Sequence, residues 1–259
     1  MIRIRPTETR FVDIRHEGWG LDWSIQFPEA IVSAEGSAMS WEPIHPDWEQ
    51  DESGAWRYAW RTTKGYLEGL QHVDAGDFVM GLALEAGIWV DGDDVCTELT
   101  ISNESGEPFH EVRSEGGCFQ ARSDVFCDHD EVARSYVAVG SKMVSMTTLH
   151  RTEPIRALYH SAKDQDDSHN WKWFWGRSDS RIDVPAVLGA LSTDGTKAVA
   201  IAYEQSVRGM QNADDHHCLH SCPRFGDLAP GESVTRCGYI RFGDDIAVLA
   251  DELREKVGA

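Results

Sequence analysis

Short segments in which apolar and polar residues alternate recur along the 259-residue chain, and this pattern constrains the fold more than any other feature. In the clearest segment, Val95, Thr97, Leu99 and Ile101 would share one face of a half-buried strand. Clusters of Gly, Asp, Asn, Ser and Pro separate such segments and are typical of turns. The sequence therefore predicts many short strands joined by tight connections.

Further strands are predicted over residues 30–32, 78–84, 132–139, 144–149, 186–191, 198–203 and 234–242. No long helical pattern lies between them, and a parallel sheet would need such helices for its crossover connections. We therefore predict an all-β fold, an antiparallel β-sandwich, rather than an α/β fold. Because sandwiches of this length commonly form one unit, we expect a single domain over residues 1–259.

One helix is predicted at the carboxyl end, over residues 244–257. Its apolar residues fall on one stripe at helical spacing: Ile246, Leu249, Ala250, Leu253 and Val257. Asp244 and Asp245 suit its first turn, and Arg254 and Lys256 suit its last turn. We expect this helix to pack across the sandwich.

Residues 40–61 form a different kind of segment, in which four tryptophans lie among prolines and acidic residues without a sustained period. We interpret this Trp-rich segment as a long structured loop. Loops of this length within a compact domain are often functional.

The net charge of −20, from 44 acidic and 24 basic residues, restricts the binding partners. Such a field repels nucleic acid and anionic membrane surfaces, so we expect neither as a partner. An anionic sugar polymer is repelled in the same way unless basic residues gather in one cleft. A neutral saccharide meets no such repulsion, and the oligomeric state is left open.

The amino-terminal residues lack the apolar core of a signal peptide, and no stretch approaches the ~20 apolar residues of a membrane span. We therefore expect a cytoplasmic protein. Scattered cysteines in a long chain are typical of reduced thiols, which we expect for Cys96, Cys118, Cys127, Cys218, Cys222 and Cys237.

Trp171, Trp173 and Trp175 occupy alternate positions and would lie on one face of a strand. Sugars stack their apolar C–H faces on such rings, so an exposed row would be a saccharide platform. The same pattern would also fit a seam in the core of a sandwich. Neighbouring polar residues favour the platform, and we treat the three tryptophans as candidate substrate-binding residues.

Residues 214–222 gather three histidines and two cysteines. In an extended chain His216, Cys218 and His220 would face one side, so zinc would need a further ligand from elsewhere. General acid/base catalysis needs only one imidazole in a cleft, and we favour His220 for that role. These side chains could also be ordinary sheet residues. No cofactor is predicted, and a divalent metal is the alternative.

A glycine pair, Gly116 and Gly117, precedes a third polar cluster and would let the backbone approach a neighbour closely. Alternate residues that would face together after the pair are Cys118, Gln120, Arg122 and Asp124. Arg122 could orient a carboxylate or stabilise developing negative charge. An exposed polar face of a sheet is the other interpretation.

The carboxyl-terminal stretch over residues 218–223, then 228–233, then a strand to Phe242, resembles the closing strands of galactose-mutarotase-like supersandwich proteins. The resemblance implies a sugar ligand, bound in a concave sheet between an imidazole and a carboxylate. The positions that match these two groups here are His220 and Glu204.

Together these features favour a carbohydrate-active enzyme, with lyase or epimerase chemistry ahead of hydrolysis. Its candidate catalytic residues are His220, Arg122, Glu204 and Arg224, and its candidate substrate-binding residues are Trp171, Trp173, Trp175, Gln120, Asn212 and His216. One alternative is a non-catalytic carbohydrate-binding protein. A second is a cupin-like metal enzyme that uses His216 and His220.

Overall fold

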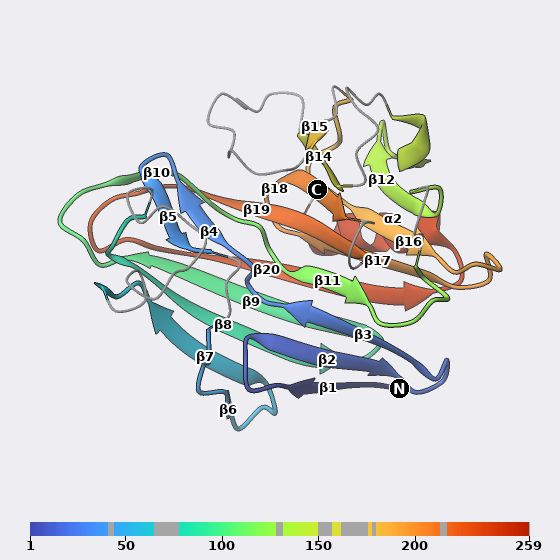
Figure 1. Cartoon of the computed structure of the whole chain (residues 1–259), viewed down its shortest axis with the longest axis horizontal. Coiled ribbons are helices and arrows are strands. Elements are labelled where there is room, and N and C mark those ends of the chain that lie inside the picture. The colour runs from blue at the N-terminus through green and yellow to red at the C-terminus, as the bar shows by residue number, and fades with distance from the viewer. Residues whose placement is uncertain are drawn as a thin grey trace.

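Two large β-sheets stack face to face in a computed structural model of the chain, with one α-helix at the carboxyl end (Figure 1). The structure describes residues 1–40, 44–64, 78–127, 132–149, 157–161, 176–177, 180–212 and 217–258. All strand pairs but one run antiparallel among these residues, apart from an isolated bridge, which confirms the predicted antiparallel sandwich. No helix of the described part is long and apolar enough to cross a membrane.

The eleven-stranded sheet carries the candidate site. Its main path runs β1 (Ile2–Pro6), β2 (Phe11–His16), β3 (Leu21–Gln26), β11 (Cys118–Ala121), β19 (Cys218–Leu228), β10 (Phe109–Ser114), β4 (Ile31–Ser33) and β5 (Gly36–Met39). β19 also pairs with β18 (Ser206–Asn212), which pairs with β14 (Ala157–Ser161), and β14 pairs in parallel with β15 (Gly176–Arg177).

The nine-stranded sheet closes the other side of the core. Its order is β13 (Lys142–Ser145), β12 (Ser135–Val139), β16 (Leu188–Leu191), β17 (Ala198–Tyr203), β20 (Ser233–Gly243), β9 (Asp94–Asn103), β8 (Leu82–Asp91), β7 (Trp56–Arg61) and β6 (Glu49–Gln50). A short 3-10 helix, η2 (Met146–Thr148), follows β13.

Successive side chains of each strand in the eleven-stranded sheet point alternately to its two faces. Ile25, Phe119 and Leu219 are aligned across β3, β11 and β19 and are buried in the core between the sheets. The ring of Phe119 lies 6.4 Å from that of Phe242 on β20. Residues at alternate positions, such as Gln120 and its partner Cys218, therefore face away from the nine-stranded sheet. We call this side the outer face.

The carboxyl-terminal helix α2 (Ile246–Lys256) packs on the far side of the nine-stranded sheet, against the alanines of β17. The Asp245 side chain accepts hydrogen bonds from the backbone N–H groups of Ala247 and Val248, and so caps the helix. Leu249 and Leu253 face the sheet and are buried. The predicted helix is thus confirmed, with slightly shorter bounds.

The structure corrects three sequence expectations. Within residues 40–61, the chain is not one long loop, because β6 and β7 form an antiparallel hairpin at the edge of the nine-stranded sheet. The strand expected over 144–149 ends at Ser145, whose side chain caps η2 by accepting from the backbone N–H of Thr147. The strand expected over 78–84 begins only at Leu82.

Candidate functional site

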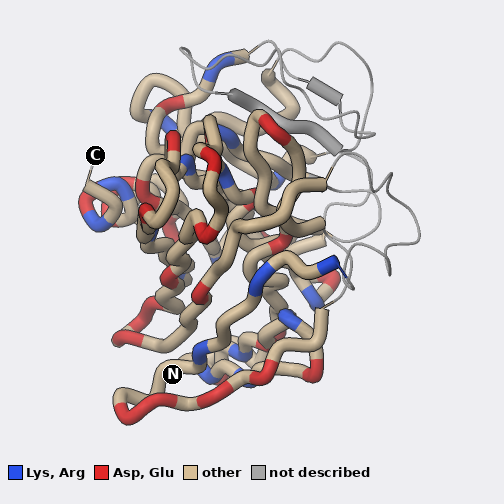
Figure 2. Tube along the Cα trace, turned by 90° about the vertical axis from the view of Figure 1, so that its left-hand side faces the viewer, with Lys and Arg blue, Asp and Glu red and all other residues tan. Residues whose placement is uncertain are grey.

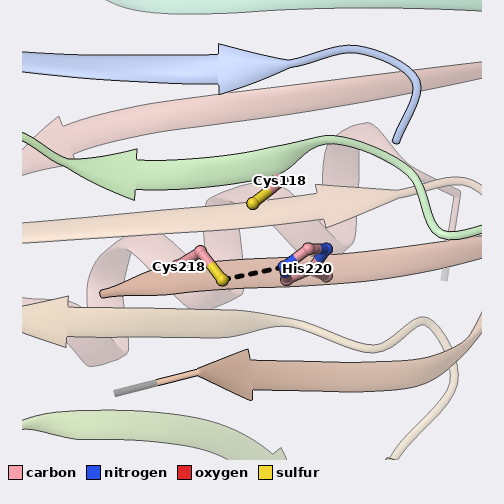
Figure 3. Close-up of side chains that lie close together, drawn as sticks. All are labelled: Cys118, Cys218 and His220. Carbon is pink, nitrogen blue, oxygen red and sulfur yellow. Dashed lines mark hydrogen bonds between the residues drawn. The ribbon is translucent and has the colours of Figure 1, made fainter. Parts of the chain in front are cut away.

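His220 lies on β19, on the outer face, and its side chain is fully buried. Its Nδ1 atom lies 2.9 Å from Oε2 of Glu29, which follows β3, and 3.4 Å from the backbone carbonyl of Glu115. Its Nε2 atom lies 3.0 Å from Sγ of Cys218 (Figure 3). Strands distant in sequence therefore bring an imidazole, carboxyl groups and thiols together.

Two thiols complete this group, which we call the His220 cluster: Glu29, Glu115, Cys118, Cys218 and His220. The ligand atoms of Cys118, Cys218 and His220 all lie within 4.8 Å of one another. Figure 3 shows the three side chains converging from neighbouring strands. Cys118 and Cys218 are buried, as His220 is, so these three side chains are shielded from bulk water.

The electrostatics of the cluster raise the pKa values of His220 and Glu115. Burial lowers the pKa of His220, but the negative charge of Glu29 and the contact with Cys118 outweigh it and raise the pKa well above the usual value. Burial and the charge of Glu29 raise the pKa of Glu115 to about 7. An imidazolium thus lies beside a carboxyl group that titrates near neutrality, which is a proton-donating and proton-accepting pair.

Two arginines add positive charge beside Glu115. Arg113 on β10 and Arg208 on β18 both act to lower the pKa of Glu115, against the effects of burial and of Glu29. Burial and the neighbouring Arg208 lower the pKa of Arg113 to about 10. These guanidinium groups could balance negative charge that develops on a ligand.

The glycine pair allows the backbone contact that the sequence predicts. A Cβ atom on Gly116 would lie 2.3 Å from the carbonyl oxygen of Ser221 on β19, and one on Gly117 would lie 2.3 Å from Ile25 on β3. Because any larger residue would collide with these neighbours, only glycine fits at both positions. The two glycines connect Glu115 directly to Cys118.

Gln120 and Arg122 lie beside the cluster. The Gln120 side chain is buried, and its Nε2 donates to Sγ of Cys118 at 3.1 Å. The exposed Arg122 follows β11, and its Nε donates to Oγ of Ser24 at 2.8 Å. Gln120 is therefore brought into contact with the cluster, whereas Arg122 lies further along the same face.

The structure does not bring the other two candidate catalytic residues into the cluster. Glu204 follows β17 of the opposite sheet, and its Oε2 accepts a hydrogen bond from the backbone N–H of Cys237 at 3.0 Å. Arg224 lies further along β19, where it forms an ion pair with Glu111. The carboxylate beside His220 is instead Glu29.

Several candidate substrate-binding residues fall outside the described part of the chain, namely Trp171, Trp173, Trp175 and His216. Asn212 is described only by its backbone, which pairs with Cys218. These five residues remain sequence predictions.

Sequence reasoning missed the carboxyl groups of the cluster. Glu115 directly precedes the glycine pair, and this position next to a close backbone approach could have identified it. Glu29 lies between β3 and β4 in a segment without any pattern, and nothing in the sequence places it beside His220.

A metal ion could also bind Cys118, Cys218 and His220, since thiolates and imidazole are the ligands that zinc prefers. Metal binding requires deprotonated thiols and a neutral imidazole. Burial raises the pKa of Cys118 well above its usual value, and the pKa of His220 is raised as well. A metal ion that binds here would therefore have to displace protons from these groups.

Comparison with known proteins identifies the fold. No protein-family model and no curated protein matches the chain. A galactose mutarotase-like protein from Lactobacillus casei superimposes with a TM-score of 0.51 at 7% identity, over 93% of this chain and 100% of that chain. A galactose mutarotase related enzyme from Lactobacillus acidophilus gives a TM-score of 0.50 at 9% identity, over 94% and 98% of the two chains.

A putative aldose 1-epimerase from Escherichia coli is also similar, with a TM-score of 0.46 at 8% identity over 95% of this chain and all of that chain. The chain thus has the galactose mutarotase-like supersandwich fold, as the resemblance of its closing strands implies. At these identities the likeness extends to the fold alone.

Proposed function

We propose that the protein is an enzyme that acts on a saccharide, with the His220 cluster as its acid/base centre. The observation that carries the proposal is the buried contact between His220 and Glu29 beside Glu115, whose pKa is raised to about 7. A group that titrates near neutrality both takes up and releases protons at the pH of the cell. The mutarotase-related names of the two neighbours on this fold support a sugar as the ligand.

The cluster suits a reaction that moves a proton on a sugar ring. Glu115 takes the proton as the general base, and the His220 imidazolium supplies one as the general acid. Glu29 holds the imidazole in place and keeps it charged. Arg113 and Arg208 balance the negative charge that develops when the substrate loses its proton.

Epimerases and lyases both fit these roles. An epimerase needs two proton-handling groups near one ring, and the cluster offers an imidazole and a carboxyl group. A lyase needs a base and neighbouring positive charge, and Arg113 and Arg208 offer that charge. Gln120 and Arg122 would bind the sugar alongside. Trp171, Trp173 and Trp175 would stack on its rings. Arg224, further along β19, would orient the oxygens of the sugar.

The first experiment is a comparison of the protein with its His220→Gln variant. Both are incubated with a panel of aldoses and oligosaccharides, and anomer and epimer interconversion is followed by NMR. Formation of unsaturated products is followed by ultraviolet absorbance. The loss of general acid/base catalysis is worth roughly 10²- to 10⁴-fold in turnover. A non-catalytic binding protein would bind a saccharide without any turnover in either form.

A metal-dependent enzyme is the second candidate, because Cys118, Cys218 and His220 converge. Elemental analysis of the purified protein, followed by zinc titration, tests it. One equivalent of tightly bound zinc that His220→Gln releases would support this candidate. Full turnover after exhaustive chelation, in a protein free of metal, would exclude it and leave the acid/base proposal standing.

A further inference from the structure

A groove of about 670 Å³ opens on the eleven-stranded sheet at its amino-terminal edge. β1, β2 and β3 line it, and Arg122 closes it on the side of β11. Asp13 and Arg15 alternate along β2 with the core residues Val12 and Ile14, so the groove lies on the same outer face as the His220 cluster. We call it the arginine groove, because it is lined by Arg3, Arg5, Arg15 and Arg122.

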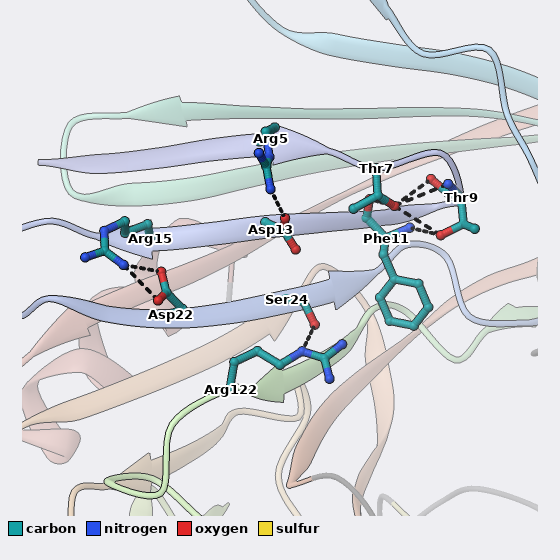
Figure 4. Close-up of polar contacts among 9 residues, drawn as sticks. All are labelled: Arg5, Thr7, Thr9, Phe11, Asp13, Arg15, Asp22, Ser24 and Arg122. Carbon is teal, nitrogen blue, oxygen red and sulfur yellow. Dashed lines mark hydrogen bonds and ion pairs between the residues drawn. The ribbon is translucent and has the colours of Figure 1, made fainter.

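Three of these arginines are paired with the three acidic residues of the groove. Arg5 lies 2.9 Å from Asp13, and Arg15 donates to both carboxylate oxygens of Asp22 at 2.8 Å (Figure 4). Arg3 lies 3.0 Å from Glu17. Every carboxylate that lines the groove is therefore already matched to an arginine.

Arg122 is the fourth arginine and has no carboxylate partner among the described residues. Its Nε donates to Ser24 at 2.8 Å, and its guanidinium carbon lies 5.9 Å from the centre of the Phe11 ring (Figure 4). These two contacts orient the guanidinium of Arg122, which lines the groove. A planar guanidinium edge held in this way matches a carboxylate, sulfate or phosphate group.

The overall charge of −20 does not prevent an anion from binding here. At physiological ionic strength the Debye length is about 8 Å, so exposed acidic residues elsewhere on the surface are largely screened from the groove. Figure 2 shows acidic and basic segments interspersed along the described trace. Four arginines against three carboxylates leave the groove locally positive. The gathering of basic residues that an anionic sugar requires is thus present.

We propose that the arginine groove binds an anionic substituent of an oligosaccharide whose reacting unit lies at the His220 cluster. This inference rests on the proposed function and names its substrate class. Arg122 follows Cys118 by four positions of extended chain, which is roughly 13 Å. The anionic group therefore belongs to a different sugar unit from the one that reacts.

The test measures binding by calorimetry at low and physiological salt. The ligands are an oligogalacturonide and the same oligomer with its carboxyl groups reduced to alcohols. A sulfated oligosaccharide and a hexose phosphate are further arms that identify the anionic group. The variants are Arg122→Gln, Arg122→Lys and, as a control for charge, Arg61→Gln. Arg61 pairs with Glu104 on the other sheet and lies outside the groove.

We expect at least one anionic oligosaccharide to bind more tightly than its neutral counterpart. Arg122→Gln should weaken that binding by roughly tenfold or more, because a charge-assisted hydrogen bond is lost. Arg122→Lys should recover part of it, and Arg61→Gln should change it little. The melting temperature of each variant checks that it is folded.

Equal binding of the neutral and anionic oligomers would overturn the inference but leave the proposed function intact. Equal losses in Arg122→Gln and Arg61→Gln would also overturn it, since the effect would then reflect overall charge. A hexose phosphate that binds through Arg122 in place of every oligosaccharide would refute the oligosaccharide part. Absence of binding and turnover with every saccharide would refute the proposed function itself.

Discussion

Nδ1 of His220 lies 2.9 Å from Oε2 of Glu29, and the side chains are 0% and 12% exposed. A carboxylate in this position holds the imidazole in one orientation and favours its charged form. Because the imidazole is buried, loss of the carboxylate would leave a positive charge without compensation. Glu29 therefore favours the protonated form of His220.

The first prediction concerns Glu29→Gln. Glutamine keeps the shape and a hydrogen-bonding oxygen but loses the charge. Burial lowers the pKa of His220, and the charge of Glu29 that opposes this effect is then absent. The pKa of His220 should therefore fall, and the imidazole should lose its proton at a lower pH than in the parent. Histidine NMR titration measures this shift, and turnover should fall by roughly tenfold or more because less imidazolium is available.

His110 and Glu35 supply the matched control. Nδ1 of His110 lies 2.6 Å from Oε1 of Glu35, but His110 is exposed, and its hydrogen bond with Glu35 raises its pKa. Glu35→Gln should lower the pKa of His110 and leave turnover unchanged. If Glu29→Gln leaves the titration of His220 unchanged, the assignment of Glu29 is wrong.

The second prediction concerns Asp94, which is 1% exposed and forms ion pairs with Arg241 and Lys256. These bonds hold α2 against the nine-stranded sheet. They lower the pKa of Asp94, although burial opposes this. The resulting stability is therefore fully present above the unfolded pKa of about 3.9 and is lost as the pH falls through the lower folded value.

Asp94→Asn should destabilise the fold by about 3 kcal/mol at pH 7, because two cationic side chains lose a buried partner. Denaturant unfolding at several pH values measures this, and the difference from the parent should shrink below about pH 4. Glu104→Gln removes the exposed partner of Arg61 and should cost at most about 1 kcal/mol. Equal effects of the two substitutions would contradict the prediction.

The third prediction concerns Gly116→Ala. Gly116 has φ +59°, and an added Cβ would collide with the backbone oxygen of Ser221. Backbone strain and the forced movement of β19 together should cost about 3 kcal/mol or more. Gly92 has φ +60° but nothing within 4 Å of the added Cβ, so Gly92→Ala isolates the strain alone. Similar melting temperatures for the two variants would refute the close approach.

The fourth prediction concerns Trp173→Ala and follows from the alternation of Trp171, Trp173 and Trp175. An exposed platform predicts that saccharide binding weakens by ~1 kcal/mol or more with little loss of stability. A core seam predicts instead a loss of ~3 to 5 kcal/mol of folding stability. Thermal melting together with a tryptophan fluorescence titration distinguishes the two interpretations. Severe destabilisation would refute the platform interpretation.

Local pattern was enough to predict the strand class, the strand over 198–203 and the carboxyl-terminal helix. The alternation in residues 118–122 also placed Cys118 and Gln120 on one face correctly. Ile2 with Ile4, and Val12 with Ile14, show the same alternation and could have identified β1 and β2. Such properties follow from side-chain direction in a single strand.

The site itself was decided by the tertiary structure. His220 could be proposed as an acid/base residue from its sequence neighbours, but its partner Glu29 is separated from it by most of the chain. Glu204 was expected in that role and is directed toward Cys237 instead. Alternation within one strand sets which face a residue occupies, whereas the order and register of strands depend on packing between distant segments. The sequence alone therefore determined the faces of the strands, and only the folded sandwich determined which residues meet on the outer face.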